Sequence, residues 1–227
     1  MNNIEPMAII GMACKFPKSS SVKEFWERLC NSEDCISEIP KDRWCSRKYY
    51  SSDTDLESKS HASEGGFISE DIRLFDNVLF GISEKEAEIM DPQQRILLEV
   101  SWELFEHAGV PIDDLRETLT GVYIGAFCMD NQLQRLSVYS RHLIDAFTAT
   151  SSSLTLLSNR LSHFYNLIGP SIAIDTACSS SLVAVHLACQ AINNGDCQQA
   201  IVGGVNIMMR PEYSIAMSKG RFLSKDN

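Results

Sequence analysis

The stretch PSIAIDTACSSSLVAVHLACQAINNGDCQQAIVGGVNIMM, residues 170–209, decides the fold class. It contains a short apolar run, a longer run with apolar residues at helical spacing that ends at a glycine, and a second short apolar run. Two strands that are joined through a helix with short links are typical of a crossover between parallel neighbours in one sheet. The stretch therefore predicts a strand, a helix and a strand in an α/β protein.

Cys178 lies in this stretch, between the first predicted strand and the helix. Unpaired N–H groups and the helix dipole favour a thiolate there, and the first helical turn offers donors to an oxyanion. The turn lifts the side chain off the sheet end where ligands of open α/β folds bind. Ala177, Ser179 and Ser180 are small and leave room for an acyl group. Position alone makes a nucleophile and a small buried packing residue about equally good interpretations.

The other cysteines give weaker signals. The eight occur at positions 14, 30, 35, 45, 128, 178, 189 and 197, without a CxxC pair or a zinc-finger spacing. Cys30, Cys35 and Cys45 form the one loose cluster, which we interpret as three separate thiols in a reducing cytosol in preference to a metal site. Cys189 and Cys197 fit the interpretation as packing residues.

The rest of the chain supplies further helices and strands. Residues 6–12 predict a buried strand, and residues 121–127 predict another. Helices are predicted over residues 21–31 with Ser21 as the N-cap, over 91–109 with Asp91 as the N-cap, and over 152–169. The first helix places Val22, Phe25, Trp26 and Leu29 on one face, and residues 40–65 are predicted to be a long polar surface excursion.

Composition and charge narrow the class of protein. The chain has 227 residues, enough for one large domain or two small ones, and a formal net charge of −10. This acidic balance argues against broad binding to nucleic acid or to anionic membranes, because their phosphates would be repelled. The sequence has no apolar run of the roughly 18 residues that span a bilayer, and no signal peptide is recognised, so we expect a cytoplasmic location.

Several ordered motifs give the sequence a family resemblance. The nucleophile segment GPSIAIDTACSSSLVAVHLA (169–188) is the most specific of them. It is preceded by AIIGMACKFP, by EFWERL with ISEIPKDRW, and by the long stretch from GGF (65–67) to EHAG (106–109). AIVGGVNIMMRPE and KGRFLSKD follow in order. With these motifs the chain resembles β-ketoacyl synthases of the type I polyketide and fatty-acid synthase branch from end to end.

The resemblance implies a fold and an activity. The family has a thiolase-like layered αβαβα fold made of two similar halves, and residues 1–227 would be the N-terminal half, with the C-terminal half absent. An acyl group would pass from the phosphopantetheine arm of an acyl carrier protein to Cys178, and a malonyl thioester would then lose carbon dioxide and attack it. The substrates would arrive on that arm, and no bound cofactor is expected. A complete synthase would be a homodimer that pairs through residues 171–174.

The sequence also departs from the family pattern. The resemblance implies two further catalytic histidines, in segments like HGTGT and NIGH, and a supporting lysine, all downstream of Asn227. The histidines that are present lie in no matching motif, and we assign none of them a catalytic role: His61, His107, His142, His163 and His186. Two other hypotheses remain: a truncated remnant or dimerisation fragment, and, more weakly, a Cys–His hydrolase on another α/β fold.

Overall fold

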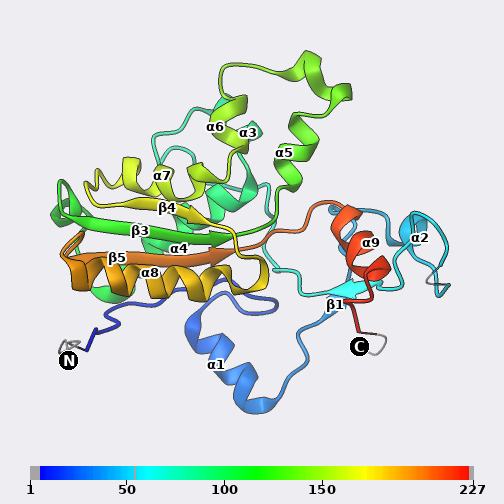
Figure 1. The fold of residues 1–227 in the computed structure, drawn as a ribbon, viewed down its shortest axis with the longest axis horizontal. Helices are drawn as coiled ribbons and strands as arrows, with labels where there is room; N and C mark the ends of the chain where they lie inside the picture. The colour runs from blue at the N-terminus through cyan, green and yellow to red at the C-terminus, as the bar shows by residue number, and fades with distance from the viewer. Residues whose placement is uncertain (1–5, 54, 225–227) are drawn as a thin grey trace. The chain divides into compact units, whose positions relative to one another are not determined.

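The computed structural model describes residues 6–53 and 55–224, and these form two compact units. The first unit combines the described residues up to Ala13 with Asp71–Asn206. The second combines Cys14–Glu70 with the described residues from Ile207 onward. The first unit contains the predicted strand, helix and strand, which are drawn in yellow and orange in Figure 1.

A parallel three-stranded sheet is the centre of the first unit. Its strands are β4 (Ser171–Ile174), β3 (Thr120–Ala126) and β5 (Gln199–Val205), in that order. β3 pairs in parallel with both neighbours, so that Val122 lies beside Ser171 on one side and Ile201 on the other. Every residue of β3 is buried. The predictions of strands over residues 121–127 and on both sides of the 178–195 helix are confirmed.

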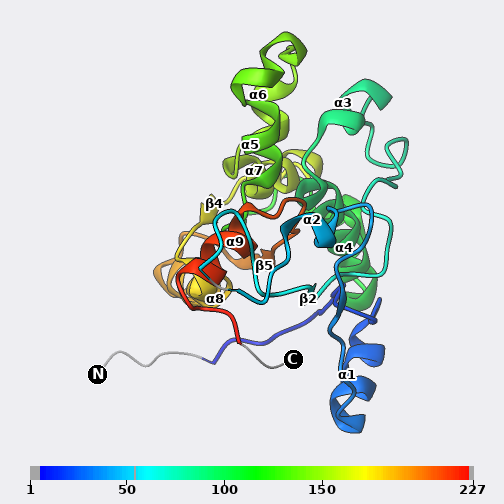
Figure 2. The same ribbon diagram turned by 90° about the vertical axis from the view of Figure 1, so that its right-hand side faces the viewer.

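Helices cover both faces of this sheet. Along β3, Val122 and Ile124 belong to one core cluster, with residues of α4 (Pro92–Ala108) and α7 (Thr155–Phe164). Tyr123 points to the opposite face and lies in a second cluster with α8 (Ser180–Asn194). This division follows from strand geometry, since successive side chains point to opposite faces. Figure 2 shows α4 and α8 on opposite sides of β5, as a layered α/β fold requires.

The predicted ends of α4 are confirmed. The Asp91 carboxylate accepts a hydrogen bond from the Gln93 N–H at 2.8 Å, and Pro92 occupies the first helical position. Gly109 ends the helix with φ 66°, a left-handed conformation that glycine adopts without steric cost. The other elements of this unit are α3 (Glu84–Ile89), η1 (Ile112–Leu115), α5 (Asp130–Arg135), η2 (Val138–Leu143), α6 (Thr148–Ser152) and η3 (Ala177–Ser179).

The prediction of a buried strand over residues 6–12 is wrong. These residues form no regular element, and the side chains of Ile9 and Ile10 are 81% and 63% exposed. Gly11 lies against the end of α4, where an added Cβ would come within 2.9 Å of the Ala108 side chain. The sequence has strand character here, but in the described part of the chain no strand edge pairs with it.

The prediction of a helix over residues 152–169 is confirmed for residues 155–164, but its two predicted ends are wrong. Ser153 is extended, with ψ 136°, and this separates α6 from α7. α7 then ends at Phe164, and Asn166 takes a left-handed φ of 53°, which asparagine tolerates better than most residues. Gly169 does not end the helix, contrary to the prediction. It lies against β3, where an added Cβ would collide with Thr120 backbone atoms.

The second unit contains short elements: α1 (Val22–Asn31), β1 (Ser37–Glu38), α2 (Ser46–Tyr49), β2 (Glu64–Gly65) and α9 (Glu212–Lys219). Ser21 caps α1 by accepting from the Glu24 N–H, as predicted, but Trp26 and Leu29 on its apolar face are 65% and 54% exposed. The predicted surface excursion, 40–65, contains α2 and β2 and is anchored by buried Trp44. No helix of the described residues is long and apolar enough to cross a membrane.

Candidate active site

Cys178 lies in η3, between β4 and α8. Figure 1 shows the turn that joins these two elements. The turn includes η3, and α8 begins at Ser180, so the thiol precedes the helix and is not part of its first turn. Ala177, directly before the cysteine, has a left-handed φ of 55°. Such a conformation costs an alanine about 1–2 kcal/mol, so the surrounding contacts must hold it. The Cys178 side chain is exposed.

Side-chain oxygens hold this turn from within. The Ser180 hydroxyl accepts a hydrogen bond from the Thr176 N–H at 2.9 Å and donates one to the Ala177 carbonyl oxygen at 2.7 Å. The Asp175 carboxylate accepts from the Ala177 N–H at 2.9 Å, and the Ser179 hydroxyl donates to the Thr176 carbonyl oxygen at 2.9 Å. The Ser180 hydroxyl therefore bridges the backbone on both sides of the strained peptide unit.

Two glycines allow the start of α8 to lie directly on the sheet. A Cβ on Gly125 of β3 would lie 2.5 Å from backbone atoms of Ser180 and Ser181. A Cβ on Gly204 of β5 would lie 2.7 Å from the Ser181 Cβ. Neither distance is compatible with a side chain, so glycine at these positions fixes how deeply the helix sits. The packing of α8 on the sheet thereby determines how far the Cys178 turn lies from the strands.

Replacing Ser180 with alanine is expected to slow the alkylation of Cys178 by iodoacetamide about tenfold. The variant loses two hydrogen bonds of about 1 kcal/mol each, which offset the conformational cost of the left-handed Ala177 and so hold the turn. Mass spectrometry measures the rate, with exposed Cys30 in the same sample as an internal reference. Ser179→Ala is the matched control and should change the rate less than about twofold, since its hydroxyl bonds only Thr176. Equal rates in Ser180→Ala and wild type would contradict the bridging role.

The other cysteines are in different environments. Burial raises the pKa of the Cys128 thiol to about 12 and also raises the pKa of Cys197. Both thiols are buried, which fits the predicted packing role of Cys197. Cys30 and Cys45 are exposed but belong to the second unit: Cys30 lies within α1, and Cys45 is the N-cap of the four-residue α2, which a loop separates from β1. Among the eight, Cys178 is the exposed cysteine on the turn that joins a strand of the parallel sheet directly to a helix.

The histidines do not complete a Cys–His pair at Cys178. His107 Nδ1 accepts a hydrogen bond from the Met12 N–H at 3.3 Å. His61, in the second unit, lies 2.7 Å from the Ser218 hydroxyl through Nδ1. His186 is exposed on α8. Within the described residues no histidine hydrogen-bonds the Cys178 thiol, and no group of acidic, cysteine and histidine side chains could hold a metal ion.

A buried polar cluster beyond the carboxyl end of β3 has no counterpart among the sequence predictions. Gln93 donates to the Asp91 carboxylate at 3.3 Å and to the Cys128 carbonyl oxygen at 3.0 Å, and the Asn131 amide donates to the Ser151 carbonyl oxygen at 3.0 Å. Burial raises the pKa of Asp91 to about 6, although the Gln93 hydrogen bonds and the Arg95 charge oppose this. The sequence indicated only the capping role of Asp91.

Asp91 predicts a specific pH dependence of stability. The folded-state pKa of Asp91 is raised from 3.8 to about 6. Between these two pH values the folded protein therefore holds a proton that the unfolded chain has released. The free energy of unfolding should therefore fall between about pH 4 and pH 6, by roughly 3 kcal/mol in total. Asp91→Asn keeps the capping oxygen and should remove this decline, as measured by urea unfolding. Parallel pH profiles of wild type and variant would contradict the assignment.

The fold and the turn together define a class: a layered α/β protein that presents a cysteine on a strand-to-helix turn at the carboxyl edge of a parallel sheet. The family model for the β-ketoacyl synthase N-terminal domain matches residues 4–227. The chain therefore belongs to the β-ketoacyl synthase family, as the sequence motifs indicate.

The similar curated proteins are polyketide synthases. Polyketide synthase PksN of Bacillus subtilis is 45% identical over 222 residues, which are 98% of this chain and 4% of that protein. A phenolphthiocerol/phthiocerol polyketide synthase of Mycobacterium tuberculosis is 42% identical over 221 residues, which are 97% of this chain and 14% of that protein. The chain thus spans a small part of each.

Solved ketosynthase domains have the same fold. The oxazolomycin ketosynthase domain OzmH KS7 of Streptomyces albus superposes with a TM-score of 0.88 at 42% identity, over 96% of this chain and 38% of that one. The ketosynthase from module 6 of the Bacillus subtilis bacillaene synthase gives 0.81 at 36% identity, over 96% and 35%. These similarities confirm the predicted layered fold and identify the chain as an N-terminal ketosynthase domain of the polyketide synthase type.

Proposed function

We propose that residues 1–227 are the N-terminal half of a ketosynthase whose nucleophile is Cys178. The enzyme transfers an acyl group from the phosphopantetheine arm of an acyl carrier protein to this cysteine, and then extends it by decarboxylative Claisen condensation in polyketide assembly. The observation that carries the proposal is the exposed thiol on the strained turn before α8. Mapping of an acyl adduct to the Cys178 peptide by mass spectrometry tests it.

The first step needs only local groups. The Cys178 thiolate attacks the thioester carbonyl carbon, its sulfur–carbon bond forms, and the phosphopantetheine sulfur leaves with the electron pair and takes up a proton. Thioester exchange is nearly balanced in energy, and a thiolate is both a good nucleophile and a good leaving group. The positive end of the α8 helix dipole follows the thiol directly in the chain and is suited to stabilise the tetrahedral oxyanion.

The second step needs groups outside residues 1–227. An enolate forms when the malonyl thioester loses carbon dioxide, and the family resemblance assigns its stabilisation to two downstream histidines. The exposed face of α8 supports a missing half: Leu182 and Val185 are 74% and 46% exposed. The solved ketosynthases are also much longer, since the chain covers only 38% and 35% of them. We therefore propose that a second half packs on this face and completes the site.

We further propose that the complete ketosynthase is a homodimer that pairs through β4. In the described part of the chain β4 hydrogen-bonds only to β3, so its outer edge is available to a second copy. An antiparallel pair of identical edges across a two-fold axis is self-complementary. Sedimentation of the complete protein at micromolar concentration should show a dimer, and a monomer alone would refute the pairing.

A further inference from the structure

We propose that Gln93 is a positioning residue for acyl transfer. Its side-chain amide holds residues 127–131, the β3-exit segment, as a wall beside the Cys178 turn, and this wall limits the bulk of the acyl group that reaches the thiol. The proposal rests on the proposed function of Cys178 and adds a residue that sets its selectivity. Gln93 lies in the first turn of α4 and is only 1% exposed.

The β3-exit segment and the Cys178 turn leave the sheet side by side. β3 and β4 are parallel neighbours, with Gly125 beside Ile174, so the chain continues from both strands at the same edge (Figure 1). Gly125 also lies against the start of α8, where an added Cβ would come within 2.5 Å of Ser180 backbone atoms. The β3-exit segment therefore begins beside the turn that carries Cys178.

The Gln93 amide joins this segment to α4. Its Nε2 group donates to the Cys128 carbonyl oxygen at 3.0 Å and to the Asp91 carboxylate at 3.3 Å. A side-chain amide carries two N–H donors, so it can serve both acceptors. Asp91 is itself fixed by the helix that it caps, because its carboxylate accepts from the Gln93 backbone N–H at 2.8 Å. The amide is thereby oriented by Asp91 and bonds the segment through Cys128.

The Gln93 bond holds the middle of the segment. The far end is held separately, because the Asn131 amide donates to a carbonyl oxygen of α6 at 3.0 Å. Cys128 is only 2% exposed, so water does not readily replace the Gln93 amide at its carbonyl oxygen. Phe127 and Met129 are half-buried, and in a loosened segment both side chains can give way to a bulky group. The wall therefore depends on one buried amide.

The neighbouring residue, Gln94, offers a matched comparison. Its side chain is also 1% exposed, but its Nε2 group donates to the Thr150 carbonyl oxygen at 3.1 Å and its Oε1 accepts from Arg160 Nε at 2.9 Å. These bonds join α4 to α6 and α7 and not to the β3-exit segment. A change at Gln94 therefore removes a buried amide from the same helix turn without releasing the wall.

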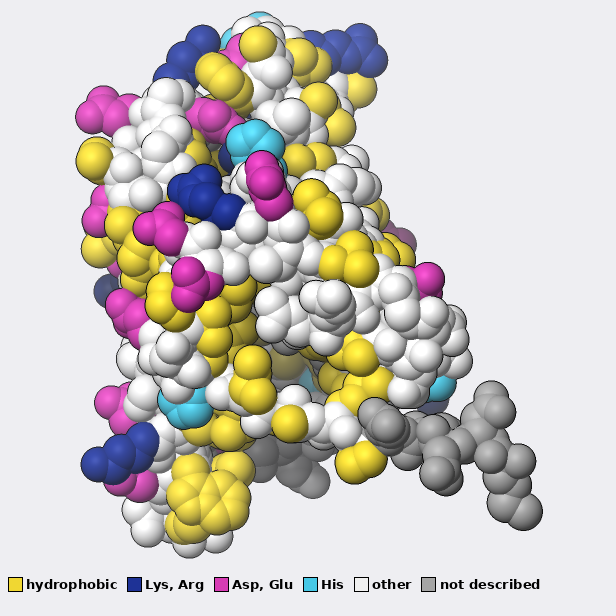
Figure 3. All heavy atoms as spheres, turned by 90° about the vertical axis from the view of Figure 1, so that its left-hand side faces the viewer, with side chains coloured by type: hydrophobic (Ala, Val, Ile, Leu, Met, Phe, Trp, Pro, Cys, Tyr) yellow, Lys and Arg dark blue, Asp and Glu magenta, His cyan; other side chains and the backbone are white. Residues whose placement is uncertain are grey.

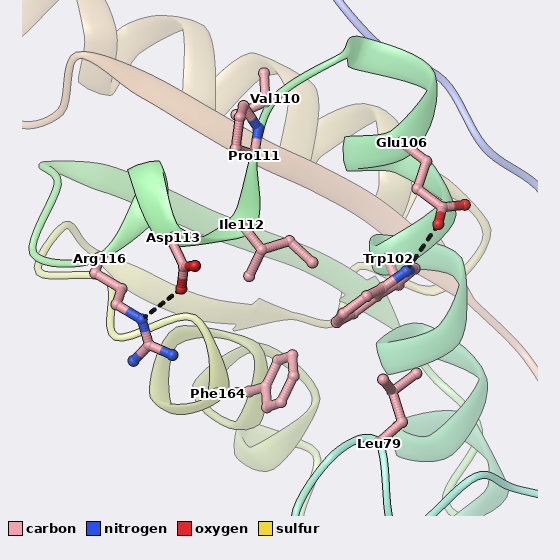
Figure 4. Close-up of a pocket in the computed structure, with 9 residues that line it drawn as sticks. All are labelled: Leu79, Trp102, Glu106, Val110, Pro111, Ile112, Asp113, Arg116 and Phe164. Atoms are coloured by element: carbon pink, nitrogen blue, oxygen red, sulfur yellow. Dashed lines mark hydrogen bonds and ion pairs between the residues drawn. The ribbon is translucent and has the colours of Figure 1, made fainter.

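The groove at the opposite edge of the sheet is too far along the strands to receive the acyl group. Figure 3 views the molecule from this amino-terminal edge and shows acidic side chains beside apolar ones. The groove has a volume of about 530 Å³, and Trp102, Ile112 and Phe164 are among its walls (Figure 4). Ile112 and Phe164 precede β3 and β4, whereas Cys178 follows β4. The acyl group is therefore selected at the carboxyl edge, where ligands of open α/β sheets bind.

The test compares a small and a bulky reagent at Cys178 in the complete ketosynthase. Iodoacetamide and N-benzyl iodoacetamide share one reactive group, and mass spectrometry of the Cys178 peptide gives both rates. In Gln93→Met, which removes the donor at similar side-chain length, we expect the ratio of the small-reagent rate to the bulky-reagent rate to fall about fivefold, the effect of one hydrogen bond. Gln94→Met should change this ratio less than about twofold. Only ratios are compared, so a general change in thiol reactivity cancels.

A second variant, Gln93→Asn, keeps the amide but is one methylene too short to reach Cys128, so the ratio should fall in the same direction. It decides the question alone if Gln93→Met does not fold. An unchanged ratio in the folded Gln93 variants, or an equal fall in Gln94→Met, would overturn the proposal. Loading of Cys178 by acetyl and isobutyryl thioesters is measured in the same samples, and the preference for acetyl should narrow in parallel. Alkylation needs no acyl transfer, so a failure of loading is distinguished from a failure of the wall.

Discussion

Replacing Cys178 with serine in the complete synthase is expected to lower the rate of acyl loading and condensation roughly 10⁴-fold to 10⁶-fold, as the loss of a covalent nucleophile does. A serine hydroxyl stays protonated at neutral pH and needs an adjacent base. In the described part of the chain no histidine hydrogen-bonds the side chain at this position. The acyl adduct and the chain-extended product are both quantified by mass spectrometry.

The matched control for this substitution is Cys30→Ser. Cys30 is also exposed, so the variant removes an accessible thiol elsewhere and should leave both steps unchanged. If Cys178→Ser kept more than about a tenth of the wild-type rate, the nucleophile would have to be another residue. An adduct that persists on Cys30 or Cys45 in the Cys178→Ser variant would identify nonspecific acylation and is subtracted from the measured yield.

A protein of residues 1–227 alone is expected to acylate itself weakly at Cys178 and to make no carbon–carbon bond. In the proposed mechanism, loading needs only the Cys178 thiolate and the positive end of the α8 dipole, both within this chain. Condensation must also stabilise an enolate, and the histidines that the family resemblance assigns to this lie outside these residues. Losing a preorganised oxyanion donor costs about 10²–10³ in rate, and losing acid–base help about 10²–10⁴.

The measurement incubates the purified 227-residue protein with an acyl thioester and a malonyl-loaded carrier protein. Mass spectrometry should detect a mass shift confined to the Cys178 peptide and no β-ketoacyl product. A chain-extended product made by this protein alone would contradict the proposal that condensation needs groups outside residues 1–227. The exposed apolar side chains on α8 also predict aggregation of the isolated half, so light scattering is recorded in parallel.

The sequence determined the elements whose signals are local. α4 could be placed to the residue, because an N-cap aspartate, a proline at the first position and a terminating glycine act through bonds to neighbouring residues. The strand–helix–strand unit around Cys178 followed from apolar periodicity and a short link, and the family resemblance identified the cysteine. Fold class and candidate nucleophile could therefore both be predicted from the order of residues alone.

Only the tertiary structure decided the features that depend on a partner distant in sequence. Residues 6–12 have strand character, but a strand forms only beside another edge, and the described chain leaves Ile9 and Ile10 exposed. The depth of α8 depends on Gly125 and Gly204, which lie in two other strands. The raised pKa of Asp91 depends on burial among residues from three separate segments. Such contacts exist only after folding, so they cannot be predicted from local patterns in the sequence.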